Sequence, residues 1–468
     1  MRIGIRILLL RTASVLLLLA VSAAAVLFMQ RERVGGIYTS AEPLEYGYSD
    51  DEMPRVDEIA DSEYNLFLEL RAADKKYDID DGFIRFCADD ENINSDGMLL
   101  SSCADYLKTS GYDDEMWETL TGYTFSVLYD LYTGAAYSAP DITVAGDIYY
   151  RHKTTLAFAG DINLSDGWYN MERYRESGDT GKHFSAGVLE LTRGADIFMV
   201  NNEFSVSERG QPLAGKTYTF RANPGDLSIY HDIGVDIVSL ANNHVYDYGP
   251  DAFEDTLTNL DGAGILRVGA GSDIGEASSP RYIISGGMKI GFISATSAET
   301  AVFTPQATES TGGVMYMYDD SAFCDAVRRT AENCDFVIAY VHFGTENSNE
   351  ISDSQRQTAH NLIDAGADMV IGAHPHVLQP IEYYNGHAIV YSLGNFWFNT
   401  TTADTAILTV SASVGIRETL RFIPCIQSGG AVRTANGDEV TRIISDMNSR
   451  SATAVIGDDF RVKETDNR

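Results

Sequence analysis

Basic residues are scarce in this chain. Its 468 residues include 34 Lys and Arg against 68 Asp and Glu, which gives a formal net charge of −34 at pH 7. A surface this poor in positive charge argues against nucleic-acid binding, which depends on Lys and Arg against phosphates. It also argues against a polyanionic substrate held by direct electrostatics, unless bound metal ions supply the positive charge.

Cysteine is also scarce, and its spacing argues against a common kind of metal site. None of the five cysteines forms a Cys-x-x-Cys pair, so a thiolate zinc site is not expected. In an oxidising location, Cys87 with Cys103 and Cys324 with Cys334 would be the candidate disulfides. The alternative, that all five are small buried hydrophobic residues, is equally compatible with the sequence.

Several catalytic signatures are missing. The chain has no Gly-x-x-x-x-Gly-Lys-Ser/Thr phosphate loop, no Gly-x-Ser-x-Gly elbow and no His-Glu-x-x-His helix. The short glycine clusters at 262–264 and 269–271 lack a dinucleotide-binding fingerprint and are interpreted as turns. No repeat with a period of about 20–50 residues is visible, which argues against a solenoid.

Residues 1–36 are predicted to anchor the chain in a membrane. Three arginines precede an uncharged run, residues 12–29, which would span roughly 27 Å as a helix, close to a bilayer core. Arginines on the amino side favour keeping that end in the cytoplasm. A signal peptide cleaved near residues 22–25 is the alternative, but apolar residues continue to Met29, which favours an uncleaved single-pass anchor in the cell membrane. In both cases the body of the protein would be extracytoplasmic.

Residues 37–150 form a second, strongly acidic region. Between residues 41 and 150 there are 26 Asp and Glu against 6 Lys and Arg. The aromatic and aliphatic content is too high for plain disorder, so a small accessory domain or a partly ordered stalk is expected.

From residue 151 onward, short apolar runs alternate with amphipathic stretches, which is typical of an α/β domain. Six runs resemble buried strands: 156–159, 197–200, 237–240, 336–341, 369–371 and 388–391. The segment 352–365 is predicted to be a helix that ends at Gly366. We expect the main domain to cover residues 151–400, with strands and a helix in 401–468 completing it.

Polar residues follow each of these runs. They are Asp161, Glu203, Asn243 with His244, His342, the pair His374 and His376, and Asn395. Because ligands bind outside the carboxyl ends of strands in an open α/β sheet, these side chains are expected to meet there. His374 and His376 are two residues apart, so a strand would point both rings the same way. Carboxylate, amide oxygen and imidazole together suit Mn, Fe or Zn.

Each of these residues has an ordinary structural explanation when taken singly. Asp161 would be a turn or helix-capping residue, Asn243 a turn residue and His342 a hydrogen-bonded core histidine. Taken together, the residues favour a metal site over separate structural roles, because four of the nine histidines lie at these strand ends. The other five are interpreted as structural or surface residues: His152, His183, His231, His360 and His387.

The order of these motifs resembles the CapA family, named for poly-γ-glutamate capsule biosynthesis, which is similar to the calcineurin-like metallophosphatases. The matching segments are AGDINL (159–164), NNEFSV (201–206), ANNHVYDYG (241–249), HFGTE (342–346), GAHPHVLQPIEYYNG (372–386) and YSLGNFWF (391–398). They extend over about half the chain, and GAHPHVLQPIE and SLGNF are highly specific. The resemblance implies a four-layer αββα sandwich of two mixed sheets covered by helices.

The resemblance also implies roles for individual residues. One or two divalent metal ions would be held by Asp161, Glu203, Asn243, His342, His374 and His376. His244 would contact the substrate or protonate the leaving group, while the ions would activate water for attack on phosphorus. The chain departs from the metallophosphatase pattern at Asn163, where histidine is usual, and at Glu203, where aspartate is usual; Phe343 also replaces the usual tryptophan of CapA-like proteins.

Three functional hypotheses follow. The first is a membrane-anchored CapA-like protein that synthesises or processes a poly-γ-glutamate-type anionic polymer, with a metal-dependent hydrolytic step on a phosphoester or related bond. The second is a non-enzymatic scaffold or export subunit that works with a polymer synthase and export partners. The third is a general surface phosphatase or nucleotidase. No nucleic-acid partner is expected.

Overall fold

The computed structural model describes Val127, Asp130 and residues 134–145, 154–298, 302–413 and 416–465. The chain divides into two compact units, Met1–Ala135 and Ala136–Arg468, and the fold below is that of the second unit. In the described part of the chain, no helix combines the length and the apolar character needed to cross a membrane. The predicted anchor and most of the predicted acidic region lie outside the described residues.

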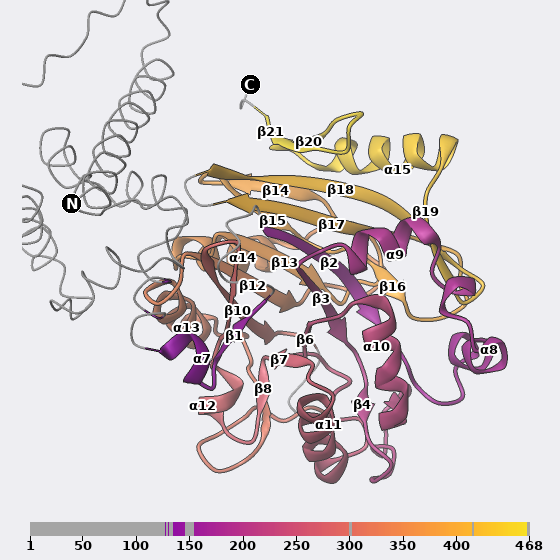
Figure 1. The fold of residues 1–468 in the computed structure, drawn as a ribbon, viewed down its shortest axis with the longest axis vertical. Helices are drawn as coiled ribbons and strands as arrows, with labels where there is room; N and C mark the ends of the chain where they lie inside the picture. Colours follow the sequence, from indigo (N-terminus) through magenta and orange to yellow (C-terminus); the bar gives the residue numbers. More distant parts are fainter. Residues whose placement is uncertain are drawn as a thin grey trace, which may run out of the picture. The chain divides into compact units, whose positions relative to one another are not determined.

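Two large sheets form the centre of this unit (Figure 1). Sheet I has seven strands in the order β1-β9-β10-β12-β13-β15-β14. Their bounds are β1 (Ile142–Val144), β9 (Arg281–Ser285), β10 (Met288–Thr296), β12 (Phe336–His342), β13 (Met369–Ala373), β15 (His387–Val390) and β14 (Ile381–Tyr384). The strands from β10 to β15 in this order pair in parallel, whereas β9 and β14 pair antiparallel to β10 and β15. β1 comes from the segment predicted to be acidic, yet it pairs with β9.

Sheet II has the order β19-β18-β17-β2-β3-β6-β7, and β16 also pairs with β2. The bounds are β19 (Ala431–Thr434), β18 (Ile416–Ser428), β17 (Ala403–Ser413), β2 (Thr154–Ile162), β3 (Ile197–Asn202), β6 (Ile237–Ser239), β7 (Leu266–Val268) and β16 (Asn395–Trp397). β2, β3, β6 and β7 are parallel, whereas β17 to β19 are antiparallel. The C-terminal segment therefore supplies three strands of this sheet, together with α15 (Gly437–Arg450), β20 (Ala454–Ile456) and β21 (Val462–Glu464).

The two sheets pack face to face across one apolar core. Along β2, Leu156 and Phe158 point into this core, whereas Ala157 and Ala159 point to the outer face, as the period of two in a strand requires. Helices pack on the outer face of sheet II: α8 (Tyr169–Ser177), α9 (Ala186–Arg193), α10 (Ser228–Ile233) and α11 (Pro250–Gly262). Others pack on sheet I: α12 (Ile274–Ala277), α13 (Ser321–Ala331) and α14 (Asp353–Asp364). The mixed α/β class predicted from the sequence is confirmed, and the layer order is helix, sheet, sheet, helix.

The predicted elements are present. All six apolar runs are strands, namely β2, β3, β6, β12, β13 and β15. The helix predicted at 352–365 is α14, which begins with a capping box: Ser352 Oγ accepts from the Gln355 backbone N–H, and Gln355 Oε1 accepts from the Ser352 N–H, both at 3.1 Å. The chain leaves this helix at Gly366, whose φ of 109° favours glycine.

The candidate Cys324–Cys334 disulfide is not formed, and the alternative of small buried residues is confirmed for the described cysteines. Both cysteines are free and buried, as is Cys425. Cys324 lies in the first turn of α13 and Cys334 lies beyond its end, so the helix separates them by about 15 Å along its axis. Their thiols instead contact backbone carbonyls, Cys324 that of Asn361 at 3.7 Å and Cys334 that of Thr330 at 3.2 Å. The other candidate pair, Cys87 with Cys103, lies outside the described residues.

We expect Cys324, Cys334 and Cys425 all to be alkylated once the protein is unfolded without reductant, because none is disulfide-bonded. In the folded protein, burial raises the pKa of Cys334 and Cys425 to about 12 and that of Cys324 to about 11, so alkylation at neutral pH should be slow. Peptide mass mapping under denaturing, non-reducing conditions checks this. A disulfide-linked peptide pair containing Cys324 and Cys334 would contradict the structure.

Candidate metal centre

The site residues expected from the sequence come together where strands of both sheets end. They are Asp161 of β2, Glu203 after β3, Asn243 and His244 after β6, His342 of β12, and His374 and His376 after β13. Their strands are parallel neighbours, β2 with β3 and β6 in sheet II and β12 with β13 in sheet I, so their carboxyl ends share an edge in each sheet. All seven side chains are largely buried. The side chain of His376 is 16% exposed.

The first group of donor atoms comes from Glu203, His342, His374 and Asn243. One carboxylate oxygen of Glu203 and one ring nitrogen each of His342 and His374 lie within 4.8 Å of one another. His342 Nε2 is 3.6 Å from Glu203 Oε1, 3.1 Å from His374 Nδ1 and 2.9 Å from Asn243 Oδ1. A carboxylate, two imidazoles and an amide oxygen that converge in this way suit one divalent cation.

The second group comes from Asp161, Glu203 and His376, whose donor atoms also lie within 4.8 Å of one another. His376 Nδ1 is 3.2 Å from Asp161 Oδ2 and 2.9 Å from Asn395 Oδ1, while its Nε2 is 4.0 Å from Glu203 Oε1. In the neutral ring, with the Nδ1 proton donated to Asn395 Oδ1, the lone pair of Nε2 faces Glu203. Glu203 therefore belongs to both groups.

One carboxylate oxygen of Glu203 has no hydrogen-bond partner among the described residues, and this shows whether a cation fits the site. Glu203 is fully buried, and its Oε1 accepts no hydrogen bond from any described residue. Buried polar atoms normally have a partner, and a buried acceptor without one costs free energy. Since this oxygen faces the ring nitrogens of His342 and His376, a cation bound by them would supply the missing partner. The residues fit a divalent cation.

The electrostatics of the first donor group favour the same interpretation. Burial, together with the neighbouring Asp161 carboxylate, raises the pKa of Glu203 well above its usual range. Burial and the neighbouring imidazoles lower the pKa of His342 well below its usual value and that of His374 to about 3, so both rings are neutral and can donate a lone pair to a metal. Burial opposes a charge on His376 too, but the hydrogen bond and charge of Asp161 outweigh it and raise its pKa.

The His374-Pro375-His376 segment differs from the strand geometry expected. β13 ends at Ala373, and the two histidines have positive φ angles of 99° and 60°. Non-glycine residues rarely adopt this conformation, and those that do cluster at functional sites. The two rings leave the strand in a turn, and their centroids are 6.1 Å apart. His374 thus joins the first donor group and His376 the second.

Asn163 occupies the position where the resemblance leads one to expect a histidine. Its Oδ1 accepts a hydrogen bond from the Ser165 backbone N–H at 2.8 Å, and its backbone carbonyl accepts one from Asn170 Nδ2 at 3.0 Å. The side-chain oxygen is therefore used in a local turn. Among the described residues, the second group has one donor fewer than the first.

His244 lies beside Glu203 but belongs to neither group. Its Nε2 is 4.0 Å from Glu203 Oε1, and its Nδ1 is 2.7 Å from Asp247 Oδ2. The ring also packs against Phe220, with the centroids 4.2 Å apart. A carboxylate next to Nδ1 keeps the proton of the neutral ring on that atom, so Nε2 can accept a proton on the Glu203 side and donate it once the ring is protonated.

Two residues of this network, Asp247 and Lys216, were not predicted from the sequence. Asp247 accepts a hydrogen bond from the Phe220 N–H at 2.7 Å and forms an ion pair with Lys216 Nζ at 2.8 Å. Lys216 also donates to the backbone carbonyl of Asn243. Asp247 could have been predicted from the sequence, because it follows His244 by three residues in the same motif. Lys216 could not, since it comes from a distant loop between β4 (Ser205–Val206) and β5 (Arg221–Ala222).

Comparison with known proteins places this centre in a family. Residues 155–400 match the family described as bacterial capsule synthesis protein PGA_cap. The PGA biosynthesis protein CapA of Bacillus subtilis is 33% identical over 259 residues, 54% of this chain and 66% of that protein. The capsule biosynthesis protein CapA of Bacillus anthracis is 32% identical over 267 residues, 55% of this chain and 64% of that protein. The chain thus spans slightly less than two thirds of the length of these relatives.

A solved Staphylococcus aureus structure described as a candidate 5′-nucleotidase is more distant. Its TM-score is 0.37 at 13% identity, over 64% of this chain and 59% of that one, so the likeness is weak. The family match, in contrast, covers more than half of the 468 residues and contains every residue of both donor groups. The chain therefore belongs to the bacterial capsule synthesis family PGA_cap, the CapA family of poly-γ-glutamate capsule biosynthesis.

Proposed function

We propose that this chain is a membrane-anchored, extracytoplasmic protein that hydrolyses a phosphoester or related bond while an anionic cell-surface polymer is made or processed. The observation that carries the proposal is that two sets of metal-type donors share Glu203, with His244 beside them. Membership of the CapA family supports the polymer as the context. The helix, sheet, sheet, helix order supports a four-layer sandwich of the metallophosphatase type.

The residues of the site have different roles in the proposed reaction. One or two divalent ions of Mn, Fe or Zn type, held by the two donor groups, would supply positive charge and Lewis acidity at the scissile bond. When its ring is protonated, His244 can donate the proton on Nε2 to a leaving oxygen. Asp247 keeps the His244 ring in one orientation and tautomer, and Lys216 in turn holds Asp247. The burial of these groups excludes water and strengthens their interactions.

The cellular setting is part of the proposal. The uncharged run at residues 12–29, with arginines before it, supports a single-pass anchor that leaves the body of the protein outside the cytoplasm. A polymer synthase and export subunits in the same membrane would be its partners. A mature protein that keeps its N-terminus and sediments with membranes would support this setting, and a soluble protein that lacks the run would contradict it.

The hydrolytic step is tested with the full-length, metal-loaded protein against a panel of phosphomonoesters and phosphodiesters. Replacing His244 with alanine is expected to lower kcat by about 100- to 10,000-fold, because the leaving group loses its proton donor. Metal content should stay at the wild-type level, since His244 belongs to neither donor group. The matched control is His231→Ala, an exposed histidine of α10, which should leave turnover unchanged.

A non-enzymatic scaffold or export subunit is the second candidate function. The geometry of Asn163 favours it, because that side chain leaves the second donor group one donor short. Metal binding without turnover of any phosphoester would support this candidate. Turnover that survives His244→Ala would overturn the role proposed for that residue.

A further inference from the structure

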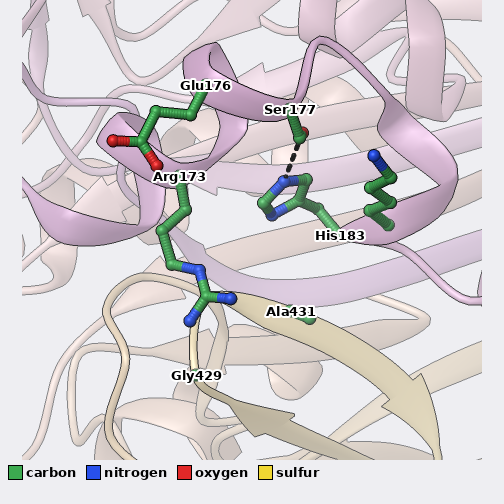
Figure 2. Close-up of a pocket in the computed structure, with 7 residues that line it drawn as sticks. Arg173, Glu176, Ser177, His183, Gly429 and Ala431 are labelled. Atoms are coloured by element: carbon green, nitrogen blue, oxygen red, sulfur yellow. Dashed lines mark hydrogen bonds between the residues drawn. The ribbon is translucent and has the colours of Figure 1, made fainter.

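A cavity of about 280 Å³ lies between α8, the 3₁₀ helix η1 (Thr180–Lys182) and the turn that joins β18 to β19 (Figure 2). Arg173 and Glu176 line it from α8, and Lys182 lines it from η1. Figure 2 shows Arg173 and Glu176 on one side of the cavity and the His183 ring on the other. None of these residues belongs to the two donor groups of the metal centre, so the cavity is a separate site.

Two cations in this cavity are available to an external anion. Arg173 and Lys182 are exposed, and neither side chain is paired with a carboxylate among the described residues; the Arg173 guanidinium only lies 5.6 Å from the Tyr169 ring centroid. The neighbouring Arg175, in contrast, is paired with Asp166 and Asp226. In a chain with twice as many acidic as basic residues, two such cations at one cavity form a local positive site that an anion can approach.

The wall of the cavity is held rigidly in place. His183 is buried; its Nδ1 donates to the Gly430 carbonyl at 2.8 Å, and its Nε2 lies 2.8 Å from Ser177 Oγ. Its ring packs against Tyr174 and Trp397, with centroid distances of 5.2 and 6.1 Å. Trp397 Nε1 donates to the same Gly430 carbonyl at 2.9 Å. A cavity whose wall is already ordered loses little conformational entropy when a ligand binds.

The elements that build the cavity also lead to the metal centre. Trp397 follows Asn395 by two residues in β16, which places their Cα atoms about 7 Å apart, and Asn395 Oδ1 accepts a hydrogen bond from His376 Nδ1. On the other side, Asn170 of α8 donates to the backbone carbonyl of Asn163, two residues after Asp161. A polymer held in the cavity would therefore be bound by segments that adjoin the metal centre.

The lining selects one chemical class of polymer. Guanidinium and ammonium groups bind carboxylates through charge-assisted hydrogen bonds, whereas the Glu176 carboxylate can only accept hydrogen bonds. An acidic polyamide has a partner for each of these groups. Its residues carry carboxylates that can accept hydrogen bonds from the cations, and its backbone carries amide N–H groups that can donate to Glu176. A phosphate polymer has no N–H donor and would be repelled by Glu176. The acidity of the whole chain acts weakly here, because charges more than about 10 Å away are largely screened at 0.1 M salt.

We propose that this cavity is a binding subsite for an acidic polyamide, with polymer carboxylates at Arg173 and Lys182 and an amide N–H directed at Glu176. The inference rests on the proposed function for its choice of polymer, but not on the metal centre or on catalysis. It assigns to the α8 face the task of holding the chain beside the centre.

Fluorescence anisotropy with a labelled poly-γ-glutamate oligomer tests the subsite, using the full-length protein in detergent with EDTA and about 0.1 M salt. Arg173→Gln combined with Lys182→Gln should weaken binding about tenfold or more, because two charge-assisted contacts are lost. Both positions are exposed, so the fold should be retained. The matched control is Arg329→Gln with Lys463→Gln, which removes the same charge at exposed positions outside the cavity and should change the Kd less than twofold.

The outcomes separate the subsite from the proposed hydrolysis. Equal weakening by the two double variants, or none by the cavity variant, would overturn the subsite, whatever the phosphoester panel shows. Equal affinity for a polyphosphate of matched charge would overturn the assignment to a polyamide. Oligomer binding that is intact in Glu203→Gln and lost in the cavity variant supports the subsite, even if no phosphoester is turned over.

Discussion

Replacing Glu203 with glutamine is expected to abolish the binding of divalent cations at both positions, with affinities for Mn or Zn at least about a hundredfold weaker than in the wild type. The reason is that Glu203 alone contributes to both donor groups, whereas His342 and His374 belong to one and Asp161 and His376 to the other. Glutamine has nearly the same shape, but it lacks the negative charge that would lie closest to the cations.

The substitution should leave the fold intact. Glu203 is fully buried, and burial together with Asp161 raises the pKa of its carboxyl well above the usual range, which favours the protonated form of this group when no cation is bound. A neutral glutamine resembles that protonated state. We therefore expect the metal-free variant to unfold at nearly the same urea concentration as the metal-free wild type, which separates a loss of metal from a loss of structure.

Metal content is measured by mass spectrometry after incubation with Mn, Fe or Zn and removal of free ions. His374→Ala and His376→Ala serve as controls, because each removes a ligand from one group only and should leave the ion of the other group bound. If Asn163 makes the second position the weaker one, His374→Ala will lower total metal more than His376→Ala does. A Glu203→Gln protein that retains wild-type metal content would contradict the shared role of this residue.

The strand ends were predictable because local chemistry determines them. An apolar run of four to six residues followed within three residues by Asp161, Glu203 or His342 shows both where a strand lies and where its polar end begins. Such runs do not show which strands pair with one another or to which sheet each strand belongs. β2, β3 and β6 belong to one sheet and β12 and β13 to the other, and only the folded chain brings Glu203 within 3.6 Å of His342.

The features that the sequence did not reveal depend on backbone geometry or on distant contacts. The two-residue spacing of His374 and His376 predicted one shared direction, but their positive φ angles send the rings to different donor groups. The spacing of Cys324 and Cys334 in the sequence is compatible with a disulfide. In the structure, however, most of α13 separates the two cysteines. Lys216 acts through its ion pair with Asp247, a contact between loops that neither local pattern indicates.

Gly160→Ala is expected to destabilise the protein by about 3 kcal/mol or more, although it adds a single methyl group. A Cβ at this position would lie 1.8 Å from the carbonyl oxygen of Gly394 and 2.9 Å from its carbonyl carbon. The two backbones approach so closely because the Asp161 N–H donates to that same oxygen at 3.1 Å. The added methyl must therefore push β16 away from β2 and break this hydrogen bond.

The same displacement should reduce metal binding, since Gly160 precedes Asp161 and Gly394 precedes Asn395, the two residues whose oxygens lie nearest His376 Nδ1. Urea unfolding and metal content measure the two effects. The matched control is Gly262→Ala at the end of α11, where an added Cβ meets nothing within 4 Å; helix propensity predicts that it stabilises the protein by about 0.5–1 kcal/mol. A Gly160→Ala protein with wild-type stability and full metal content would show that β2 and β16 are not in contact at this point.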